Sequence, residues 1–365
     1  MNDANKKLEA IRREIDELDN ELLTLINRRA RLAKKVAGVK DDEGSAHYYR
    51  PEREAEVLRS LVAGNDGPLP GEHVSRIFQE IVSACRALQK PLAVAYLGPE
   101  GTFTERAALK HFGHAIDSRP VDSIGAVFRQ VESGGGDYGV VPIENSTEGV
   151  VGHTLDMFAS SGLSICGEVE LRIHHCLMAN LGELEDIGKI YSHQQSFAQC
   201  RRWLDVNLPK VEQETVSSNA EAARRAASEP GCAAIAGESA ADDYRLRVLA
   251  SNIEDEPGNT TRFVVIGRQA AGATGRDKTS VLFSTKDRPG ALYELLQSFK
   301  KRDINMTRIE SRPSRRGNWN YVFYVDFDGH VADANVSAAL AELEELAPFF
   351  KSLGSYPKCD PWAAQ

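Results

Sequence analysis

The chain has 365 residues, more than one domain usually contains, so we expect two or three domains. Its formal net charge of -9 at pH 7 and its pI near 5.6 argue against nucleic acid or an anionic membrane as the main partner. The first residues, MNDANKKLEA, contain no apolar signal-peptide segment, and no run long enough to span a membrane follows. We therefore expect a cytoplasmic protein that binds neither nucleic acid nor a membrane.

The cysteines and histidines form no metal-binding pattern. The six cysteines are scattered without a C-x-x-C pair, which is typical of buried thiols in a reducing compartment. His174, His175 and His193 have no cysteine or carboxylate at metal-ligand spacing. The sequence therefore predicts no metal site.

The first ninety residues have the pattern of long amphipathic helices. Apolar residues recur at spacings of three and four from Leu8 to Val36, so one helix should extend over about residues 5–39. Such a helix would be roughly 50 Å long, too long for a small monomeric domain to bury, so we expect it to pair with its counterpart in a homodimer. A second helix is expected over 51–62 and a third over 72–89, after the connector GNDGPLPG.

Polar side chains lie on or beside this apolar face. Arg29 replaces an apolar residue, and Lys40 follows it on the same face. Cys85 and Gln89 are four residues apart on the third helix. Arg29 could simply pair with Glu54 or with a glutamate of another chain. Converging cations could instead bind carboxylates, which guanidinium groups suit.

Arg12 and Arg29 are separated by about 25 Å along one helix, so no small ligand reaches both within one chain. An antiparallel partner helix would bring Arg12 of one chain near Arg29 of the other. The pattern therefore favours a composite site between subunits.

The segment LEAIRREIDELDNELLTLINRRARLAKKVAGVK, followed by RPEREAEVL and a third helix ending at Gln89, resembles the all-helical AroQ-type chorismate mutases, which are intertwined homodimers. Their Claisen rearrangement needs no nucleophile or cofactor, only a compact conformer and stabilised charge. The resemblance implies that Lys40 and Gln89 bond the ether oxygen and that Glu54 bonds the ring hydroxyl. It implies substrate binding by Arg12 from the other chain, Arg29, Lys40, Arg50, Arg53, Glu54, Cys85 and Gln89, with Arg50 and Cys85 standing where the family often has Asp and Ser.

From Leu92 the pattern changes to alternating strands and helices, which indicates largely parallel sheets with ligands at the carboxyl ends of strands. Strands are expected over 92–97, 138–143, 176–179, 189–192, 232–236 and 263–266. Helices are expected over 104–112, 123–132, 147–160, 196–206, 219–228 and 237–244.

The stretch GDYGVVPIENSTEGVV runs from an apolar strand into Glu144, Asn145, Ser146 and Thr147, and then into a helical pattern. A strand, a polar turn and a helix can present backbone N–H groups to an anion. The same small polar residues are also good helix N-caps. Both interpretations remain open from the residues alone.

Most of the remaining hydroxyl and amide side chains lie at the ends of expected strands, where they would line a polar cleft suited to a small dicarboxylate, with Arg262 binding a carboxylate. The motifs GPEGTFTE, DYGVVPIENSTEGVV, YSHQQSFAQC and NTTRFVVIG are similar to those of prephenate dehydratase. The resemblance implies that Thr261 is catalytic and assists loss of the ring hydroxyl by orientation and hydrogen bonding. It implies a substrate site of Thr102, Asn145, Ser146, Thr147, Ser192, His193, Gln195, Thr261, Arg262 and Phe263. The family commonly has S-H-P-Q where this chain has SHQQ.

After the polar linker RQAAGATGRDK, the order of expected elements is βαββαβ, a ferredoxin-like plan, with a hairpin at RRGNWN. This could be a small structural or dimerising domain. It resembles an ACT domain of the prephenate dehydratase type, which implies that L-phenylalanine binds at a dimer interface and inhibits the enzyme. The implied effector residues are Gly290, Ala291 and Leu292 with Glu310, Ser311 and Arg312.

Together these resemblances imply a multidomain P-protein, a bifunctional chorismate mutase/prephenate dehydratase of phenylalanine biosynthesis without cofactors. We expect an all-α domain over 1–90, a two-lobed α/β domain over 92–268 and an α+β ferredoxin-like domain over 279–358. Its expected small-molecule partners are chorismate, prephenate and the effector L-phenylalanine. Two alternatives are a non-catalytic sensor built like a solute-binding protein, and a monofunctional dehydratase whose N-terminal helices only dimerise.

Overall fold

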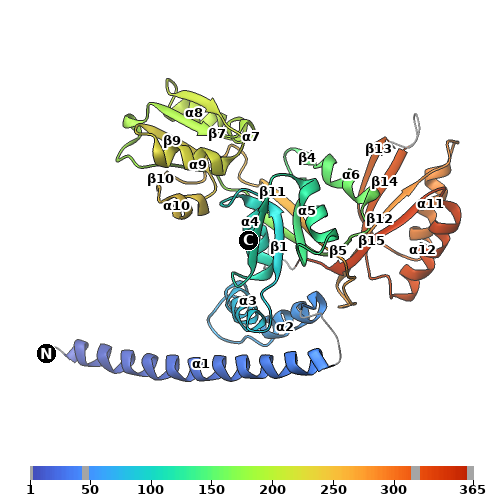
Figure 1. The fold of residues 1–365 in the computed structure, drawn as a ribbon, viewed down its shortest axis with the longest axis horizontal. Helices are drawn as coiled ribbons and strands as arrows, with labels where there is room; N and C mark the ends of the chain where they lie inside the picture. The colour runs from blue at the N-terminus through green and yellow to red at the C-terminus, as the bar shows by residue number, and fades with distance from the viewer. Residues whose placement is uncertain (1–2, 43–48, 314–320, 360–365) are drawn as a thin grey trace.

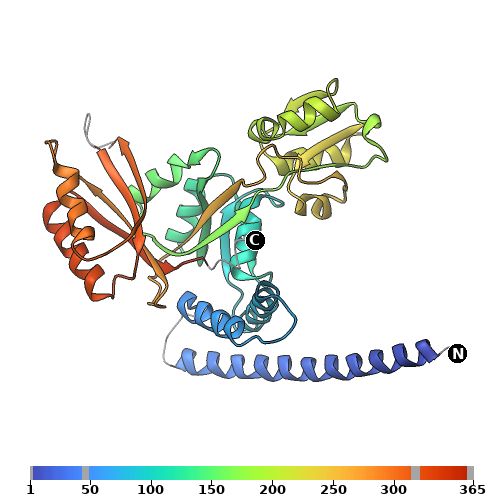
Figure 2. The same ribbon diagram turned by 180° about the vertical axis from the view of Figure 1, so that it is seen from behind.

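The computed structural model describes residues 3–42, 49–313 and 321–359. Figures 1 and 2 show a central α/β lobe with a second lobe at one end and a C-terminal β-sheet with its helices at the other. The N-terminal helices lie along one side of the central lobe. This arrangement confirms the predicted multidomain fold class.

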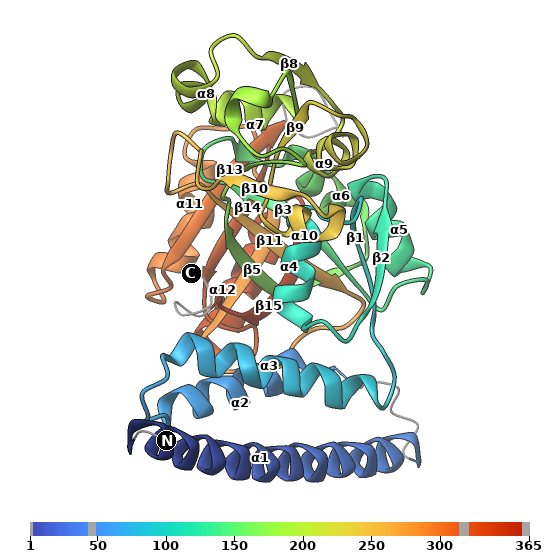
Figure 3. The ribbon, with the colours of Figure 1, turned by 90° about the vertical axis from the view of Figure 1, so that its left-hand side faces the viewer.

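The N-terminal unit contains the helices α1 (Asp3–Asp42), α2 (Pro51–Ala63) and α3 (Gly71–Ala87). Figure 3 shows α2 and α3 between α1 and the rest of the chain. The apolar face of α1 is exposed along its length, and Leu25, for example, is 57% exposed. A second helix could cover this face, so the homodimer stays a prediction. Because α3 ends at Ala87, Gln89 lies beyond it, and the expected i, i+4 pair with Cys85 on one helix is wrong.

The two central lobes each contain one mixed sheet. The first has the strand order β2-β1-β3-β11-β5, and the second has the order β10-β6-β9-β7-β8. The first-lobe strands are β1 (Ala93–Leu97), β2 (Asp117–Val121), β3 (Tyr138–Asn145), β4 (Gly149–Val150), β5 (Ser164–Arg172) and β11 (Thr260–Gly267), with α4 (Phe103–Phe112), α5 (Ile124–Glu132) and α6 (Gly152–Ser160). The second-lobe strands are β6 (Cys176–Ala179), β7 (Lys189–Ser192), β8 (Glu212–Thr215), β9 (Cys232–Ala236) and β10 (Arg247–Ala250), with η1 (Leu184–Asp186), α7 (Gln194–Gln199), α8 (Arg201–Asn207), α9 (Asn219–Ser228) and α10 (Ser239–Tyr244).

The prediction of largely parallel sheets is wrong. Strand β11 returns from the second lobe and inserts between β3 and β5, antiparallel to both. In the second lobe, β6 is likewise antiparallel to β9 and β10. The chain leaves the first lobe after β5 and returns to it at β11, so β11 runs in the opposite direction to β3 and β5.

The predicted strand, turn and helix at residues 136–151 is also wrong. Strand β3 continues to Asn145, whose side-chain oxygen accepts hydrogen bonds from the backbone N–H groups of Thr147 and Glu148 at 3.0 Å each. This turn leads into β4, which pairs back onto β3, and α6 begins only at Gly152. Asn145 therefore closes a turn, and neither an N-cap nor an anion site at a helix N-terminus exists at Thr147.

The C-terminal unit has the predicted βαββαβ order. Its elements are β12 (Asp277–Ser284), α11 (Ala291–Lys300), β13 (Met306–Pro313), β14 (Tyr321–Asp328), α12 (Ala334–Leu346) and β15 (Phe350–Pro357), with sheet order β13-β14-β12-β15. The hairpin expected at RRGNWN lies outside the described residues. One sheet face packs on α11 and α12 through Phe283 and Val325. The other face contributes Leu282 and Tyr324 to the core of the first lobe, so the two units share one core.

Candidate active sites

The N-terminal helices hold Glu54 through a cation that the sequence interpretation missed. Arg86 Nη1 lies 2.5 Å from Glu54 Oε1, and Arg86 Nη2 donates to the carbonyl of Phe112 at 2.6 Å. Arg86 is only 5% exposed. Burial raises the pKa of Glu54, while the charges of Arg86 and Arg29 oppose that rise. The pairing of Arg29 with Glu54 that the sequence offered is therefore wrong within the chain, since Glu54 forms its ion pair with Arg86 from α3.

The other predicted mutase residues are not brought to one place within a single chain. The amide of Gln89 donates to the carbonyl of Ala33 on α1 at 2.9 Å. Arg53 is largely exposed and pairs with Glu56 at 3.2 Å. Cys85 is buried, whereas Arg12 and Arg50 are exposed. The side chain of Lys40 lies outside the described residues. A site containing Arg12 would need a second subunit.

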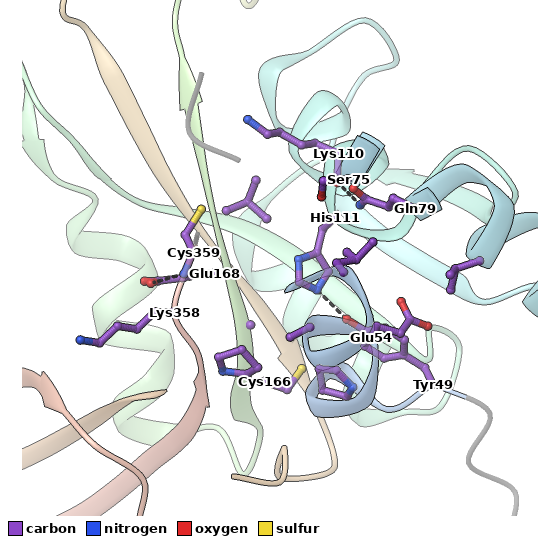
Figure 4. Close-up of a pocket in the computed structure, with 17 residues that line it drawn as sticks. Tyr49, Glu54, Ser75, Gln79, Lys110, His111, Cys166, Glu168, Lys358 and Cys359 are labelled. Atoms are coloured by element: carbon purple, nitrogen blue, oxygen red, sulfur yellow. Dashed lines mark hydrogen bonds between the residues drawn. The ribbon is translucent and has the colours of Figure 1, made fainter. Parts of the chain in front are cut away.

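A cavity of about 130 Å³ lies where α2, α3, the first lobe and the chain after β15 meet. Figure 4 shows Tyr49, Glu54 and His111 on one side of it and Glu168 and Cys359 on the other. The Tyr49 hydroxyl lies 2.7 Å from His111 Nε2. Burial, with a smaller contribution from Arg86, lowers the pKa of His111 to about 4. The imidazole is therefore neutral at pH 7.

The first lobe brings three polar side chains together at the ends of β3 and β11. Asn145 and Thr261 are directly paired across these strands. The Asn145 amide donates to Thr261 Oγ1 at 2.8 Å and to Asn259 Oδ1 at 2.7 Å. Asn259 is 3% exposed, and its own Nδ2 has no hydrogen-bond partner in the described structure. Asn259 was missed as a site residue, although it opens the NTTRF motif.

Several other predicted cleft residues have local structural partners. Thr102 caps α4, since its hydroxyl accepts from the Glu105 N–H at 3.4 Å. Ser146 Oγ accepts from the Thr260 N–H at 2.9 Å. The backbone N–H of Thr147 is bound in the Asn145 turn.

In the second lobe, one amide organises the predicted residues. Asn219 Oδ1 accepts from Ser192 Oγ at 3.2 Å and from the His193 N–H at 3.1 Å. His193 in turn caps α7 by accepting from the Gln195 N–H at 3.3 Å. Asn219 was missed because it reads as an ordinary helix-start residue. The lobes meet where the Tyr244 hydroxyl donates to the Glu100 carbonyl at 3.3 Å, beside a groove lined by Pro99, Asp122 and Ser218.

The structure contradicts the prediction that Arg262 and Phe263 line the cleft. Arg262 lies 2.9 Å from Glu168 and 2.6 Å from Asp326, and it donates to the Tyr356 hydroxyl at 3.0 Å. Side chains alternate along a strand, so Arg262 faces away from the side that Thr261 occupies. Phe263 is buried in the hydrophobic core.

The predicted effector residues lie on two segments of the C-terminal unit. Gly290 has φ of 79° immediately before α11, a conformation that favours glycine. Ala291 is buried and Leu292 half-buried at the start of that helix. Glu310, Ser311 and Arg312 lie on the edge strand β13. Arg312 Nε lies 3.6 Å from Asp156 on α6, so this guanidinium is directed toward the first lobe.

Comparison with known proteins agrees with this division. Family models for chorismate mutase type II, prephenate dehydratase and the ACT domain match residues 11–90, 94–271 and 279–345. A Pseudomonas aeruginosa protein named bifunctional chorismate mutase/prephenate dehydratase is 54% identical over 357 residues, or 96% of this chain and 98% of that one. The chain belongs to the bifunctional chorismate mutase/prephenate dehydratase family.

A Neisseria gonorrhoeae member of this bifunctional family is 51% identical, covering 95% of this chain and 96% of its own. The crystal structure of a prephenate dehydratase from Arthrobacter aurescens in complex with L-Phe is 38% identical, with a TM-score of 0.67, and the match covers 74% of this chain and 91% of that chain. The bifunctional enzyme thus joins an N-terminal mutase unit to a dehydratase unit and an ACT domain. In its described part, no helix could cross a membrane, and no cluster of three or more His, Cys, Asp or Glu side chains could hold a metal ion.

Replacing Arg86 with methionine should shift the pH dependence of the mutase reaction of the bifunctional enzyme. Arg86 opposes the rise in the pKa of Glu54 that burial causes. Without this cation the pKa of Glu54 rises further, so the acid limb of the pH–rate profile for chorismate turnover moves to higher pH. Breaking a buried pair should also lower the free energy of unfolding by about 3–5 kcal/mol. The measurement is the pH–rate profile of chorismate loss. Arg76→Met, on the exposed face of α3, is the matched control, and an unshifted profile in Arg86→Met would contradict the expectation.

The bifunctional enzyme should lose stability as the pH falls from 6.5 toward 4, partly through His111. In this range the unfolded histidine binds a proton that the folded one does not, so the unfolded state gains stability as the pH falls. The stabilisation that comes from keeping His111 neutral is complete above pH 6.5. Through this group, the free energy of unfolding should decline by about 2 kcal/mol between pH 6.5 and pH 4.5. Urea denaturation of wild type and His111→Gln at both pH values measures it. His114→Gln removes an exposed histidine as the control, and equal pH slopes for wild type and His111→Gln would refute the assignment.

Proposed function

We propose that the chain rearranges chorismate to prephenate on its N-terminal helices and then dehydrates and decarboxylates prephenate to phenylpyruvate in the two-lobed unit. The family supports both activities. The observation that carries the dehydratase proposal is the contact between Asn145 and Thr261 at adjacent strand ends. The Asn145 amide occupies an acceptor position of the Thr261 oxygen, which leaves the hydroxyl hydrogen available to donate.

In the dehydratase step, the ring of prephenate takes up one proton from solvent and loses its hydroxyl as water, while its ring carboxylate leaves as CO2 and its bonding electrons make the ring aromatic. Thr261 would donate a hydrogen bond to the departing hydroxyl oxygen, which becomes more basic as the C–O bond breaks. Asn259 carries a buried N–H without a partner beside this pair and would donate to the same substrate. His193 and Gln195 would contact the substrate from the second lobe. Ser192 is fully buried and, with the His193 N–H, donates to Asn219, so it would position this edge rather than touch the substrate.

In the mutase step, positive charge would hold the two carboxylates of chorismate in a compact conformer and stabilise negative charge on the ether oxygen. Arg29, Arg53 and Lys40 would supply this charge from one subunit, and Arg12 would supply it from the other. Glu54, held by Arg86, would bond the ring hydroxyl. The exposed apolar face of α1 supports a homodimer in which this face is covered. Neither step requires a cofactor.

L-phenylalanine would bind the ACT domain and reduce dehydratase turnover. The likeness to the Arthrobacter enzyme, crystallised with L-Phe, supports this part of the proposal. Gly290, Ala291 and Leu292 would contact the ligand together with residues of β13.

We propose the unit boundaries 1–90, 92–268 and 279–358, and a cytoplasmic location.

A coupled assay that follows chorismate loss and phenylpyruvate formation, with and without L-phenylalanine, tests the proposal. We expect both reactions and inhibition of the second. Phenylpyruvate formation from supplied prephenate without chorismate turnover would instead favour a monofunctional dehydratase. If neither substrate were consumed beyond its spontaneous decay, the chain would be a binding protein rather than an enzyme.

A further inference from the structure

Four charged side chains that the proposed reactions do not use meet between the first lobe and the ACT sheet. Arg262 Nη1 on β11 lies 2.6 Å from Asp326 Oδ2 on β14. Arg308 Nε on β13 lies 3.0 Å from Glu144 Oε2 on β3. Arg308 Nη1 is also 3.9 Å from Asp326, so the two pairs touch. We call Arg262, Asp326, Glu144 and Arg308 the interdomain clamp.

Three of the four side chains of the clamp are largely withdrawn from water, whereas that of Glu144 is 37% exposed. The side chain of Asp326 is 4% exposed and those of Arg262 and Arg308 are each 11% exposed. Burial alone would raise the pKa of Asp326, but Arg262 and a hydrogen bond from Ser280 bring it below its usual value. Asp326 is therefore ionised, and its contact with Arg262 joins full charges in a low-dielectric setting. Such a contact resists loosening, because an unpaired buried charge is strongly unfavourable.

The clamp and the proposed dehydratase site occupy neighbouring positions on the same two strands. Thr261 is paired with Asn145, and Arg262 is paired with Glu144. Successive side chains point to opposite faces of a sheet, so each strand presents one residue to the cleft and the next to the ACT domain. A shift at the clamp would therefore displace Asn145 and Thr261 through the backbone.

Strand β13 links the clamp to the proposed effector site. Arg308 lies two residues before Glu310 and four before Arg312, so these three side chains share one face of the strand. Arg312 also approaches Asp156 on α6. The strand that carries the proposed effector residues is thus in contact with the first lobe through two of its arginines.

We propose that the interdomain clamp positions the Asn145–Thr261 pair and transmits the state of the ACT domain to it. Arg262 and Glu144 are then positioning residues of the dehydratase rather than ligands of prephenate. This inference rests on the proposed dehydratase activity and its inhibition by L-phenylalanine. It assigns a physical route to that inhibition, namely two ion pairs that hold adjacent catalytic strands.

The test uses the full chain with Glu144→Gln, Arg308→Gln and the charge-reversed pair Glu144→Arg with Arg308→Glu. Each single variant should lower the dehydratase kcat about tenfold with little change in KM, because misplaced catalytic groups reduce the rate more than binding. The concentration of L-phenylalanine needed for half inhibition should rise about tenfold or more, the usual size of an allosteric coupling. L-phenylalanine binding, measured by calorimetry, and mutase turnover should persist. The charge-reversed pair should recover part of the lost kcat and inhibition, because it restores the pair between positions 144 and 308 but places a second carboxylate near Asp326.

Glu342→Gln is the matched control, because Glu342 on α12 pairs with Lys301 and Arg302, which directly follow α11, on the helix side of the ACT domain. It should behave as wild type. Single variants that keep wild-type kcat and inhibition would contradict the proposed role of the clamp. So would single variants that lose both L-phenylalanine binding and mutase activity without recovery in the charge-reversed pair. If wild type itself ignored L-phenylalanine or left prephenate intact, the proposed function would fail before the clamp came into question.

Discussion

Replacing Thr261 with alanine should reduce phenylpyruvate formation by about 100- to 10,000-fold while chorismate still becomes prephenate. The hydroxyl is the group that Asn145 orients at the end of β11, and alanine retains the strand but removes the donor. The loss should fall on kcat, because the hydrogen bond to the leaving oxygen strengthens as the bond breaks. The measurement is single-substrate kinetics with prephenate, together with chorismate loss in the same preparation.

Two neighbouring substitutions sharpen this test. Thr261→Ser keeps a hydroxyl at the same position and should retain most of the activity. Thr260→Ala removes the adjacent hydroxyl, which donates to the Gly258 carbonyl at 3.2 Å, and should have a small effect. Equal loss of both reactions in Thr261→Ala would refute independent sites, and unchanged dehydration would exclude Thr261 as the donor.

The sequence predicted best where local pattern and burial agree. Strands β6, β7 and β9 and helix α9 have the predicted bounds because continuous apolar runs or clear caps delimit them. Strands β2 and β8 were missed because their sequences, DSRPV and EQET, are polar and lie at sheet edges. Polar edge strands have neither the alternation nor the apolar run by which a strand is recognised.

The errors at the candidate sites have two different origins. The orientation of Arg262 could have been deduced, because a strand with Thr261 in the cleft must direct Arg262 to the opposite face. The pairing of Glu54 with Arg86 could not have been deduced, since it depends on how α2 and α3 pack against the C-terminal end of α4. Local patterns identify which residues carry chemistry, but tertiary packing decides which of them meet.

Replacing Arg29 with alanine should reduce chorismate turnover by about 100- to 1,000-fold and leave dehydration of supplied prephenate unchanged. Arg29 is half-buried on α1 and acts on Glu54 electrostatically, whereas its neighbour Arg28 is exposed. Arg28→Ala is therefore the matched control, with turnover near wild type. Arg29→Lys keeps the positive charge but loses the planar guanidinium group, so its chorismate turnover should lie between those of Arg29→Ala and Arg28→Ala. A normal chorismate rate in Arg29→Ala would exclude this pocket.

The composite nature of the mutase site can be tested with the same variant. Arg12 and Arg29 lie about 25 Å apart on α1, so an active site that needs both must take them from two subunits. Arg12→Ala and Arg29→Ala homodimers should each be nearly inactive. In a mixed dimer one of the two sites has both arginines and the other has neither. Unfolding and refolding an equal mixture should therefore restore about a quarter of the wild-type rate, since about half of the dimers are mixed and each has one intact site. Mass spectrometry would show whether mixed dimers have formed. If they have formed and the rate of chorismate turnover does not recover, the two arginines do not act together in a site shared between subunits.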